Sequence, residues 1–197
     1  WIEGPLCFVF HYLNAWNDRG QITVDTIEFA VAPNFPLVDG TLPSYADAQG
    51  KLVRWHINLK NGDVRREHVL DVASEFPRMD ERYTGHRYRH GYIAAASTRQ
   101  RGDKGLFHEI THVDLDSGRT QTWDAGVGNG VSEPVFVPES DRAGEGAGWL
   151  LATVYKAADN NSDLVILNAA AVNEGPVATI RLDHRIPFGF HGSWRPN

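Results

Sequence analysis

The sequence has very little sulfur and no long apolar run. Cysteine and methionine each occur once among 197 residues. The single thiol, Cys7, cannot form a disulfide within the chain, so no oxidising compartment is implied and we expect a cytoplasmic protein. No stretch of about 18 uninterrupted apolar residues is present, which excludes a membrane-spanning helix and leaves peripheral membrane contact at most. The first residue is Trp1 rather than Met, and we expect this start to be a cut end.

The chain also lacks an excess of positive charge. Lys and Arg number 19 against 25 Asp and Glu, which gives a formal net charge of −6. Because nucleic acids and anionic membranes attract cationic surfaces, this balance argues against either as the main partner. Apolar residues make up 42% and charged residues 22% of the chain, a balance typical of a folded globular protein rather than a disordered one.

Little of the sequence has helical periodicity. Nineteen glycines and ten prolines separate short segments rich in β-branched and aromatic residues, which predicts an all-β protein. Tight turns are expected at Asn61-Gly62 and Ser117-Gly118, because glycine tolerates a positive φ. The expected strands are Leu6–Leu13, Gln21–Ala30, Leu52–Leu59, Val64–Leu70, Tyr88–Ser97, Phe107–Leu115, Arg119–Trp123, Val135–Pro138, Trp149–Lys156, Asp163–Asn168 and Pro176–Leu182.

A motif recurs along the chain. His56-Ile-Asn-Leu-Lys-Asn-Gly returns in the next segment as His112-Val-Asp-Leu-Asp-Ser-Gly, and Leu164-Val-Ile-Leu-Asn is a looser third copy. Units of about four strands repeated at this period predict the blades of a β-propeller.

The repeat divides the sequence into three predicted blades, residues 8–70, 75–124 and 133–182, and a further strand that begins near His191. Propellers typically need about four to eight blades to close. We therefore predict that residues 1–197 form the C-terminal part of a larger propeller domain, or one partner of a split one.

One polar residue follows the repeated unit in each copy. Glu75 begins EFPRMD, Glu133 begins EPVFVPES and His191 lies in PFGFHGSW, and the interval from the first to the second equals that from the second to the third. Counting back a slightly longer interval from Glu75 reaches His11 in FVFHYLNAW. Because the innermost strands of propeller blades line one channel, we expect these four side chains to converge. The alternative is that they are ordinary loop residues and that the spacing is chance.

Two histidines and two glutamates on one axis suit a metal site. Neutral imidazole binds Fe, Zn, Cu and Ni, and a ligating histidine commonly donates its other ring N–H to a carboxylate. The glutamates would then orient the histidines. In the competing interpretation the carboxylates bind the metal directly, as in a two-histidine, one-carboxylate triad. The spacing is compatible with both.

Taken together, six stretches resemble the C-terminal half of the carotenoid cleavage oxygenases, a family that includes apocarotenoid oxygenases, lignostilbene dioxygenases and the retinal pigment epithelium isomerase. The stretches are FHYLNAWND, EFPRMD followed by YRHGY, EPVFVPES, GWLLATVYKA, SDLVILNA and IPFGFHGSW. They occur in the family's order over nearly the whole chain. The resemblance implies a seven-bladed β-propeller with a helical cap, and on its axis Fe(II) bound by four histidines, three of which are hydrogen-bonded to glutamates.

Carried over by motif, the resemblance implies a role for five residues of this chain. His11 and His191 would be the third and fourth iron ligands, and Glu75 and Glu133 would orient them. Phe10, which precedes the third ligand, would line the substrate tunnel. No catalytic side chain is predicted beyond the metal site. The missing N-terminal half of the propeller is expected as a partner, because it would carry the other two ligands and the remaining glutamate.

The activity implied by the resemblance is a dioxygenase reaction. O₂ is inserted across a conjugated C=C bond of a carotenoid or apocarotenoid, which gives two carbonyl products. A lignostilbene or another stilbenoid is the alternative substrate, since MDERYTGHRYRHGY is similar to the lignostilbene-type members. An alternative of another class is a non-catalytic propeller fragment that acts as a binding module, because half of the ligand set is absent.

Six further histidines and three tryptophans are expected to be structural or peripheral. His56 and His112 occupy equivalent outer hairpins, where we expect a structural role. The residues expected at the surface or in loops are His68, His86, His90 and His108. Those expected to pack between blades are Trp123, Trp149 and Trp194.

Overall fold

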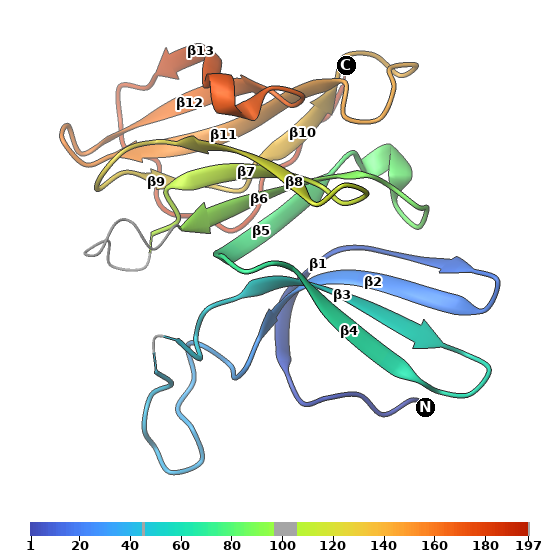
Figure 1. The fold of residues 1–197 in the computed structure, drawn as a ribbon. Coiled ribbons are helices and arrows are strands. Elements are labelled where there is room, and N and C mark those ends of the chain that lie inside the picture. The colour runs from blue at the N-terminus through green and yellow to red at the C-terminus, as the bar shows by residue number, and fades with distance from the viewer. Residues whose placement is uncertain (45, 97–105, 197) are drawn as a thin grey trace.

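The computed structural model describes residues 1–44, 46–96 and 106–196. Within these residues the chain is all-β, with three antiparallel sheets and two short 3₁₀ helices, η1 (Glu81–Tyr83) and η2 (Val172–Glu174). The sheets follow one another along the chain and lie face to face (Figure 1). No helix of the described residues is long and apolar enough to cross a membrane.

The first sheet contains four strands in the order of the sequence. They are β1 (Phe8–Asp18), β2 (Gln21–Phe29), β3 (Lys51–Asn58) and β4 (Val64–Leu70). Successive strands are antiparallel neighbours, and the β3–β4 turn contains Gly62 at φ 78°. The turn expected at Asn61-Gly62 is therefore present, because only glycine adopts this φ without steric cost.

The second sheet repeats this arrangement. It consists of β5 (Ala73–Met79), β6 (His90–Ala96), β7 (Glu109–Asp114) and β8 (Arg119–Asp124), again in sequence order. Gly118, at φ 69°, provides the expected turn between β7 and β8.

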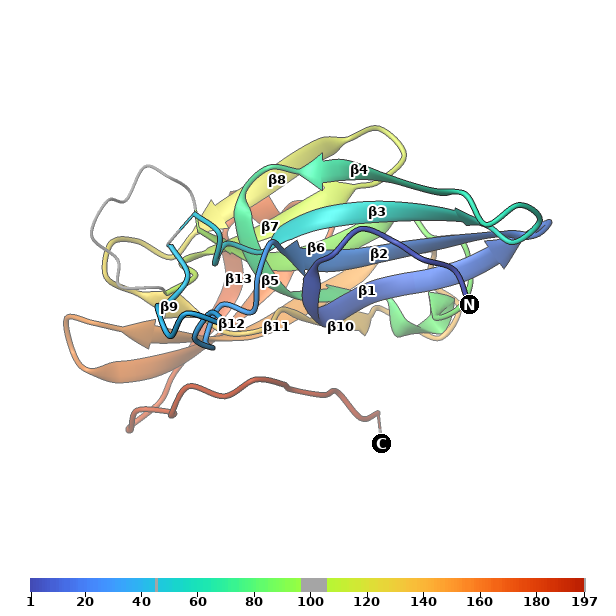
Figure 2. The same cartoon turned by 90° about the horizontal axis from the view of Figure 1, so that it is seen from below.

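The third sheet contains β10 (Val135–Pro138), β11 (Gly148–Lys156), β12 (Asn161–Asn168) and β13 (Pro176–Arg181), with the short β9 (Gly130–Val131) paired to β11. After β13 the chain leaves the sheet. Residues 183–196 run back beside it without forming a strand (Figure 2). The further strand predicted near His191 is therefore wrong for the described residues.

The three predicted blade ranges coincide with the three sheets, so the all-β class and the four-strand units are confirmed. Two strands were not predicted: β9, which is very short, and β5, whose Pro77 and irregular pattern obscure it. β1 continues to Asp18, well beyond the predicted end at Leu13. Of the strand predicted over Tyr88–Ser97, Tyr88 lies before β6 and Ser97 lies outside the described residues.

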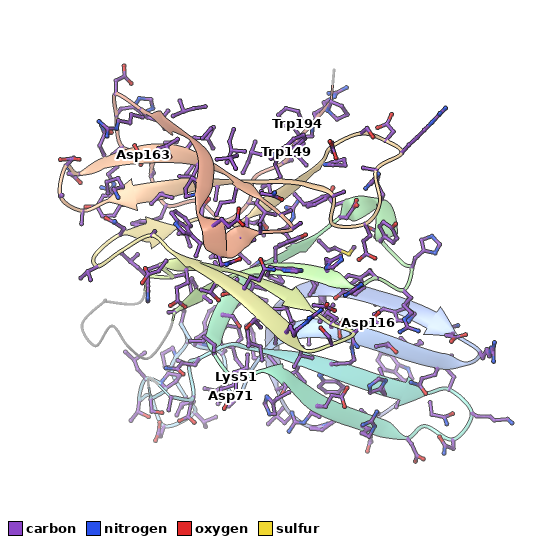
Figure 3. All side chains as sticks on the ribbon, turned by 45° about the horizontal axis from the view of Figure 1, so that its top comes forward. Lys51, Asp71, Asp116, Trp149, Asp163 and Trp194 are labelled. Atoms are coloured by element: carbon purple, nitrogen blue, oxygen red, sulfur yellow. The ribbon has the colours of Figure 1, made fainter. Side chains whose placement is uncertain are left out.

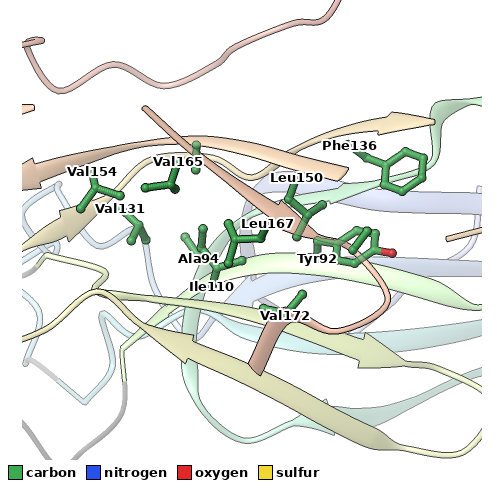
Figure 4. Close-up of a cluster of buried hydrophobic side chains, with 12 residues drawn as sticks. Tyr92, Ala94, Ile110, Val131, Phe136, Leu150, Val154, Val165, Leu167 and Val172 are labelled. Carbon is green, nitrogen blue, oxygen red and sulfur yellow. The ribbon is translucent and has the colours of Figure 1, made fainter. Parts of the chain in front are cut away.

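The central strands β6 and β7 of the second sheet are buried on both faces. Towards the third sheet, Tyr92 and Ala94 pack in an apolar cluster with Leu150 and other side chains of that sheet (Figure 4). Towards the first sheet, the intervening Ile93 packs with Leu52 and its neighbours. Full burial of an aliphatic or aromatic side chain stabilises a fold by about 1.5–3 kcal/mol, so these two clusters fix the order and spacing of the sheets.

A buried ion pair within the first sheet is hydrogen-bonded to the segment that enters β6. Asp25 in β2 is fully buried and accepts from Arg54 Nε at 2.7 Å and Nη2 at 2.8 Å. The Tyr88 hydroxyl donates to the same carboxylate at 2.7 Å. Burial and the negative charge of Asp25 raise the pKa of Tyr88 well above its usual value. We call Asp25, Arg54 and Tyr88 the inter-sheet clamp.

The tryptophans only partly follow the expectation. Trp123 packs against the cluster between the second and third sheets, as predicted. Trp149 and Trp194 are instead exposed within the described residues, so the expected packing between blades is not observed for these two (Figure 3). Trp149 faces solvent because its neighbours Leu150 and Gly148 occupy the inner side of β11.

Candidate metal centre

Four side chains from distant parts of the chain meet at one point. His11 Nε2 lies 3.2 Å from His191 Nε2, although the residues are 180 positions apart. On its other side His11 Nδ1 lies 2.6 Å from Glu75 Oε2, and His191 Nδ1 lies 3.1 Å from Glu133 Oε1. Each imidazole is thus held at Nδ1 by a carboxylate while its Nε2 faces the other ring. The convergence expected from the regular spacing is observed, so the four residues are not scattered in the fold.

His11 lies in an irregular part of β1. The strand pairs Val9 with Glu28 and Tyr12 with Thr26, so three steps along β1 match two along β2. Such a bulge bends a strand and redirects its side chains. The Thr26 hydroxyl donates to the His11 carbonyl at 2.9 Å, which gives the displaced backbone a partner.

Glu75 also begins a bulge, because β5 pairs Glu75 with Ala94 and Arg78 with Tyr92. Within it Phe76 has φ 54°, a left-handed conformation that is uncommon for any residue but glycine. This conformation directs the Phe76 N–H to Glu75 Oε2 at 2.5 Å. The backbone after Glu75 therefore fixes the carboxylate that holds His11.

Sequence reasoning missed Phe76 as part of the centre. Its ring centroid lies 5.6 Å from that of His11 and 6.5 Å from that of His191. Its place directly after Glu75 was the one signal that could have pointed to it.

Glu133 and His191 are held differently. Glu133 precedes β10 and is buried, whereas His191 belongs to the segment after β13 and its side chain is 55% exposed. Glu133 Oε2 accepts from the Gly192 N–H at 2.9 Å and from Arg78 Nη1 at 3.0 Å. Arg78, also unanticipated from the sequence, therefore lies directly behind the carboxylate that contacts His191.

The two carboxylates have different electrostatic surroundings. Burial raises the pKa of Glu75, and hydrogen bonds from the Phe76 N–H and His11 oppose this rise. Glu75 Oε1 is buried and has no hydrogen-bond partner among the described residues. Glu133 instead has the Arg78 guanidinium beside it. A cation held by the imidazoles would compensate the buried charge of Glu75.

The donor set fits a metal ion. If both Nδ1–H groups donate to carboxylates, both Nε2 atoms are acceptors, and two acceptors facing each other need a cation or a proton between them. Two nitrogen ligands of one ion lie about 2.8–3.4 Å apart for bonds of about 2.0–2.1 Å and angles of 90–109°. The observed 3.2 Å falls in this range.

Aromatic side chains surround the two imidazoles. Phe10 is partly exposed, and its ring centroid lies 6.3 Å from His11 and 5.6 Å from Phe29. A cavity of about 270 Å³ adjoins the centre and is lined by apolar residues that include Phe76, Phe107, Val131, Tyr155 and Phe188. The cavity reaches the centre through Phe76, whose ring lies beside both imidazoles. The part of Phe10 in a tunnel stays a prediction.

His56 and His112 make contacts outside the centre. His56 Nδ1 is hydrogen-bonded to Gln21 Nε2 at 3.0 Å. His112 is buried, with its Nε2 2.9 Å from His90 Nδ1. Burial and the adjacent His90 lower the pKa of His112 to about 4. The structural role expected for both is consistent with these contacts.

The surface placement expected for four histidines is right for His68 and His86 and wrong for the other two. His90 is half-buried because it begins β6 between two sheets. His108 is buried directly before β7 and lies near Glu109 and Asp124, a group that could also hold a metal ion.

Comparison with known proteins identifies the family. The family described as "Retinal pigment epithelial membrane protein" matches residues 1–196. The chain belongs to this family. The resemblance stated from the sequence motifs is thereby confirmed.

Its relatives are named as oxygenases. The isoeugenol monooxygenase of Pseudomonas nitroreducens is 33% identical over 206 residues, covering 100% of this chain and 43% of the relative. The apocarotenoid-15,15'-oxygenase of Synechocystis is 36% identical over 191 residues, covering 95% of this chain and 38% of the relative. The chain thus spans less than half the length of these relatives.

Solved structures of the family show the same fold. The lignostilbene dioxygenase of Pseudomonas brassicacearum superposes with a TM-score of 0.93 at 31% identity, over 100% of this chain and 43% of that one. Cobalt-substituted Synechocystis ACO superposes with a TM-score of 0.85 at 32% identity, over 96% of this chain and 40% of that one. The cobalt substitution indicates that this family member has a metal site.

Proposed function

We propose that this chain supplies two iron ligands of a non-haem Fe(II) dioxygenase that cleaves a conjugated C=C bond with O₂ to give two carbonyl products. The observation that carries the proposal is the pair of Nε2 atoms 3.2 Å apart, each on an imidazole backed by a carboxylate. His11 and His191 would hold the iron, while Glu75 and Glu133 orient the rings. Bound Fe(II) supplies the site that activates O₂ beside the alkene.

The chain's own residues orient ligands and exclude water. A carboxylate on Nδ1 fixes the ring tautomer, so that Nε2 keeps its lone pair for the metal. Phe10 and Phe76 lie against the imidazoles and provide an apolar wall. Such a wall suits a flat conjugated substrate and keeps solvent from the reacting double bond.

The rest of the ligand set must come from outside this chain. Two neutral nitrogen ligands do not complete an iron site, and the relatives are more than twice as long. We propose that residues 1–197 are the C-terminal part of one seven-bladed propeller domain, whose N-terminal half contributes the other two histidines and the third glutamate.

A carotenoid or apocarotenoid is the first candidate substrate, as the 36% identity to the Synechocystis apocarotenoid oxygenase supports. A stilbenoid is the second, and the TM-score of 0.93 with the lignostilbene dioxygenase, against 0.85 for the ACO structure, favours it. To decide between these two substrates, the protein is assayed separately with an apocarotenal and with a hydroxystilbene, and the aldehyde products are detected by mass spectrometry.

The first experiment is elemental analysis of the purified protein at its natural length, with its intact mass. About one iron per protein, lost in His11→Ala and in His191→Ala but retained in His68→Ala, supports the metal centre. His68 is the matched control, because it is an exposed histidine of β4. Stoichiometric zinc would contradict the dioxygenase proposal. A protein that holds no metal and cleaves neither substrate would favour the non-catalytic binding module.

A further inference from the structure

The two histidines of the centre differ in how the fold holds them. His11 lies in β1, whose neighbours in the sheet fix its backbone. His191 lies outside every strand of the described chain, and more than half of its side chain is exposed. A ligand must be held within about 0.5 Å of its working position. Some other contact must therefore fix His191.

Arg78 provides that contact from the second sheet. Its Nη1 donates to Glu133 Oε2 at 3.0 Å and to the Gly192 carbonyl at 3.1 Å. Glu133 in turn accepts the Gly192 N–H at 2.9 Å and contacts His191 Nδ1 at 3.1 Å. One guanidinium thus links β5 to both the carboxylate and the backbone that carry His191.

The charges favour this arrangement. Only 4% of the Glu133 side chain and 16% of the Arg78 side chain are exposed. A buried carboxylate without a compensating cation is strongly destabilised, so removal of Arg78 would force Glu133 to move towards water. This movement displaces the carboxylate that orients His191.

We propose that Arg78 is a positioning residue of the metal centre, which holds His191 in place through Glu133 and the Gly192 backbone. The inference rests on the proposed function for its link to iron, because it treats His191 as a ligand. The hold on residues 191–192 is independent of any metal.

Glu81 is a matched control on the same guanidinium. It contacts Arg78 Nη2, whereas Glu133 accepts from Nη1, and its side chain is 68% exposed. Glu81→Gln removes a charge beside Arg78 and leaves the contacts of Nη1 intact. Exposed ion pairs contribute little, so this variant tests whether the effect is specific to the Glu133 side.

The experiment uses the protein at its natural length with Arg78→Met, Arg78→Lys and Glu81→Gln. Amide hydrogen exchange of the metal-free protein measures the exchange rate of the Gly192 N–H. Titration with cobalt(II) measures the affinity for the metal and the absorption spectrum of the bound cobalt. In Arg78→Met we expect exchange at Gly192 to be about tenfold faster. Cobalt affinity should fall roughly 10- to 100-fold with an altered spectrum. Arg78→Lys should restore part of both, and Glu81→Gln should leave both unchanged.

Unchanged Gly192 exchange and cobalt affinity within about twofold in Arg78→Met would overturn the inference, as would an equal loss in Glu81→Gln. If Arg78→Met does not fold, Arg78→Gln, which has no charge but keeps a polar end, carries the same comparison. Failure of the proposed function appears separately. Wild-type protein would then bind no cobalt through His11 and His191, while the exchange at Gly192 still reports the hold by Arg78.

Discussion

Breaking the inter-sheet clamp should cost several kcal/mol of folding free energy. Asp25 is fully buried and receives three hydrogen bonds, two from Arg54 and one from the Tyr88 hydroxyl. Asp25→Asn keeps the size of the side chain and removes its charge. The guanidinium of Arg54, whose side chain is only 15% exposed, would then have no negative charge at position 25 to pair with.

The expected cost follows from the contacts that are lost. Removal of one member of a buried ion pair destabilises a protein by about 3–5 kcal/mol, because the remaining charge is left uncompensated. Tyr88→Phe should cost less, since it removes one hydrogen bond to a charged group, worth about 1.5–3 kcal/mol, and leaves the ion pair in place. The double variant should cost less than the sum, because both residues act on the same carboxylate.

Urea denaturation followed by tryptophan fluorescence measures these free energies. Asp71→Asn is the matched control, because the Lys51–Asp71 pair at 2.5 Å is also an ion pair but is exposed, as Figure 3 shows at the rim of the first sheet. Its loss should cost about 0–1 kcal/mol. Equal losses for Asp25→Asn and Asp71→Asn would refute the argument that burial gives the clamp its strength.

Three further predictions follow from the site and its surroundings. Glu75→Gln should weaken iron binding roughly 10- to 100-fold, measured by metal titration, because an amide fixes the His11 tautomer less firmly than a carboxylate; unchanged affinity would contradict the role of Glu75. His112 has a pKa lowered to about 4, so its neutral form stabilises the fold above the unfolded pKa of about 6.5 and this contribution is lost as the pH falls towards 4. In His112→Gln the free energy of unfolding should therefore fall less between pH 6.5 and 4 than in the wild type. Identical pH dependence of the two free energies would disprove this. Gly50→Ala should destabilise by about 1–3 kcal/mol, because a Cβ there would lie 2.5 Å from Ile27 and 2.7 Å from the Ser74 carbonyl; denaturation at wild-type urea concentrations would rule this out.

The repeat made most of the architecture predictable from the sequence. Its period reflects a unit of four strands, and the same period separates Glu75 in β5, Glu133 before β10 and His191 after β13. The limits of the sheets and the convergence of the site residues follow from this periodicity. Neither depends on side-chain detail, and so both could be predicted from the sequence.

The contacts that hold the site could not be predicted from the sequence, because they depend on departures from regular strand geometry. The left-handed φ of Phe76 has no sequence signal, since the residue is neither glycine nor asparagine. Arg78 reads as an ordinary strand cation until Glu133, 55 positions away, is placed beside it. The burial of His108 likewise depends on packing between strands of different sequence segments.

The bulges explain how one strand serves both the core and the metal centre. In an unbroken strand His11 and Leu13 would point to the same face, because side chains alternate with a period of two. Leu13 packs in the core between the first two sheets, so a regular β1 would direct the imidazole there as well. Register shifts on both sides of Tyr12 break the alternation, and β5 has a shift just after Glu75. The irregular pairing is thus what allows His11 to meet Glu75 and His191 while the same strand keeps its apolar contacts, and a variant that restored regular pairing in β1 would gain hydrogen bonds and lose the centre.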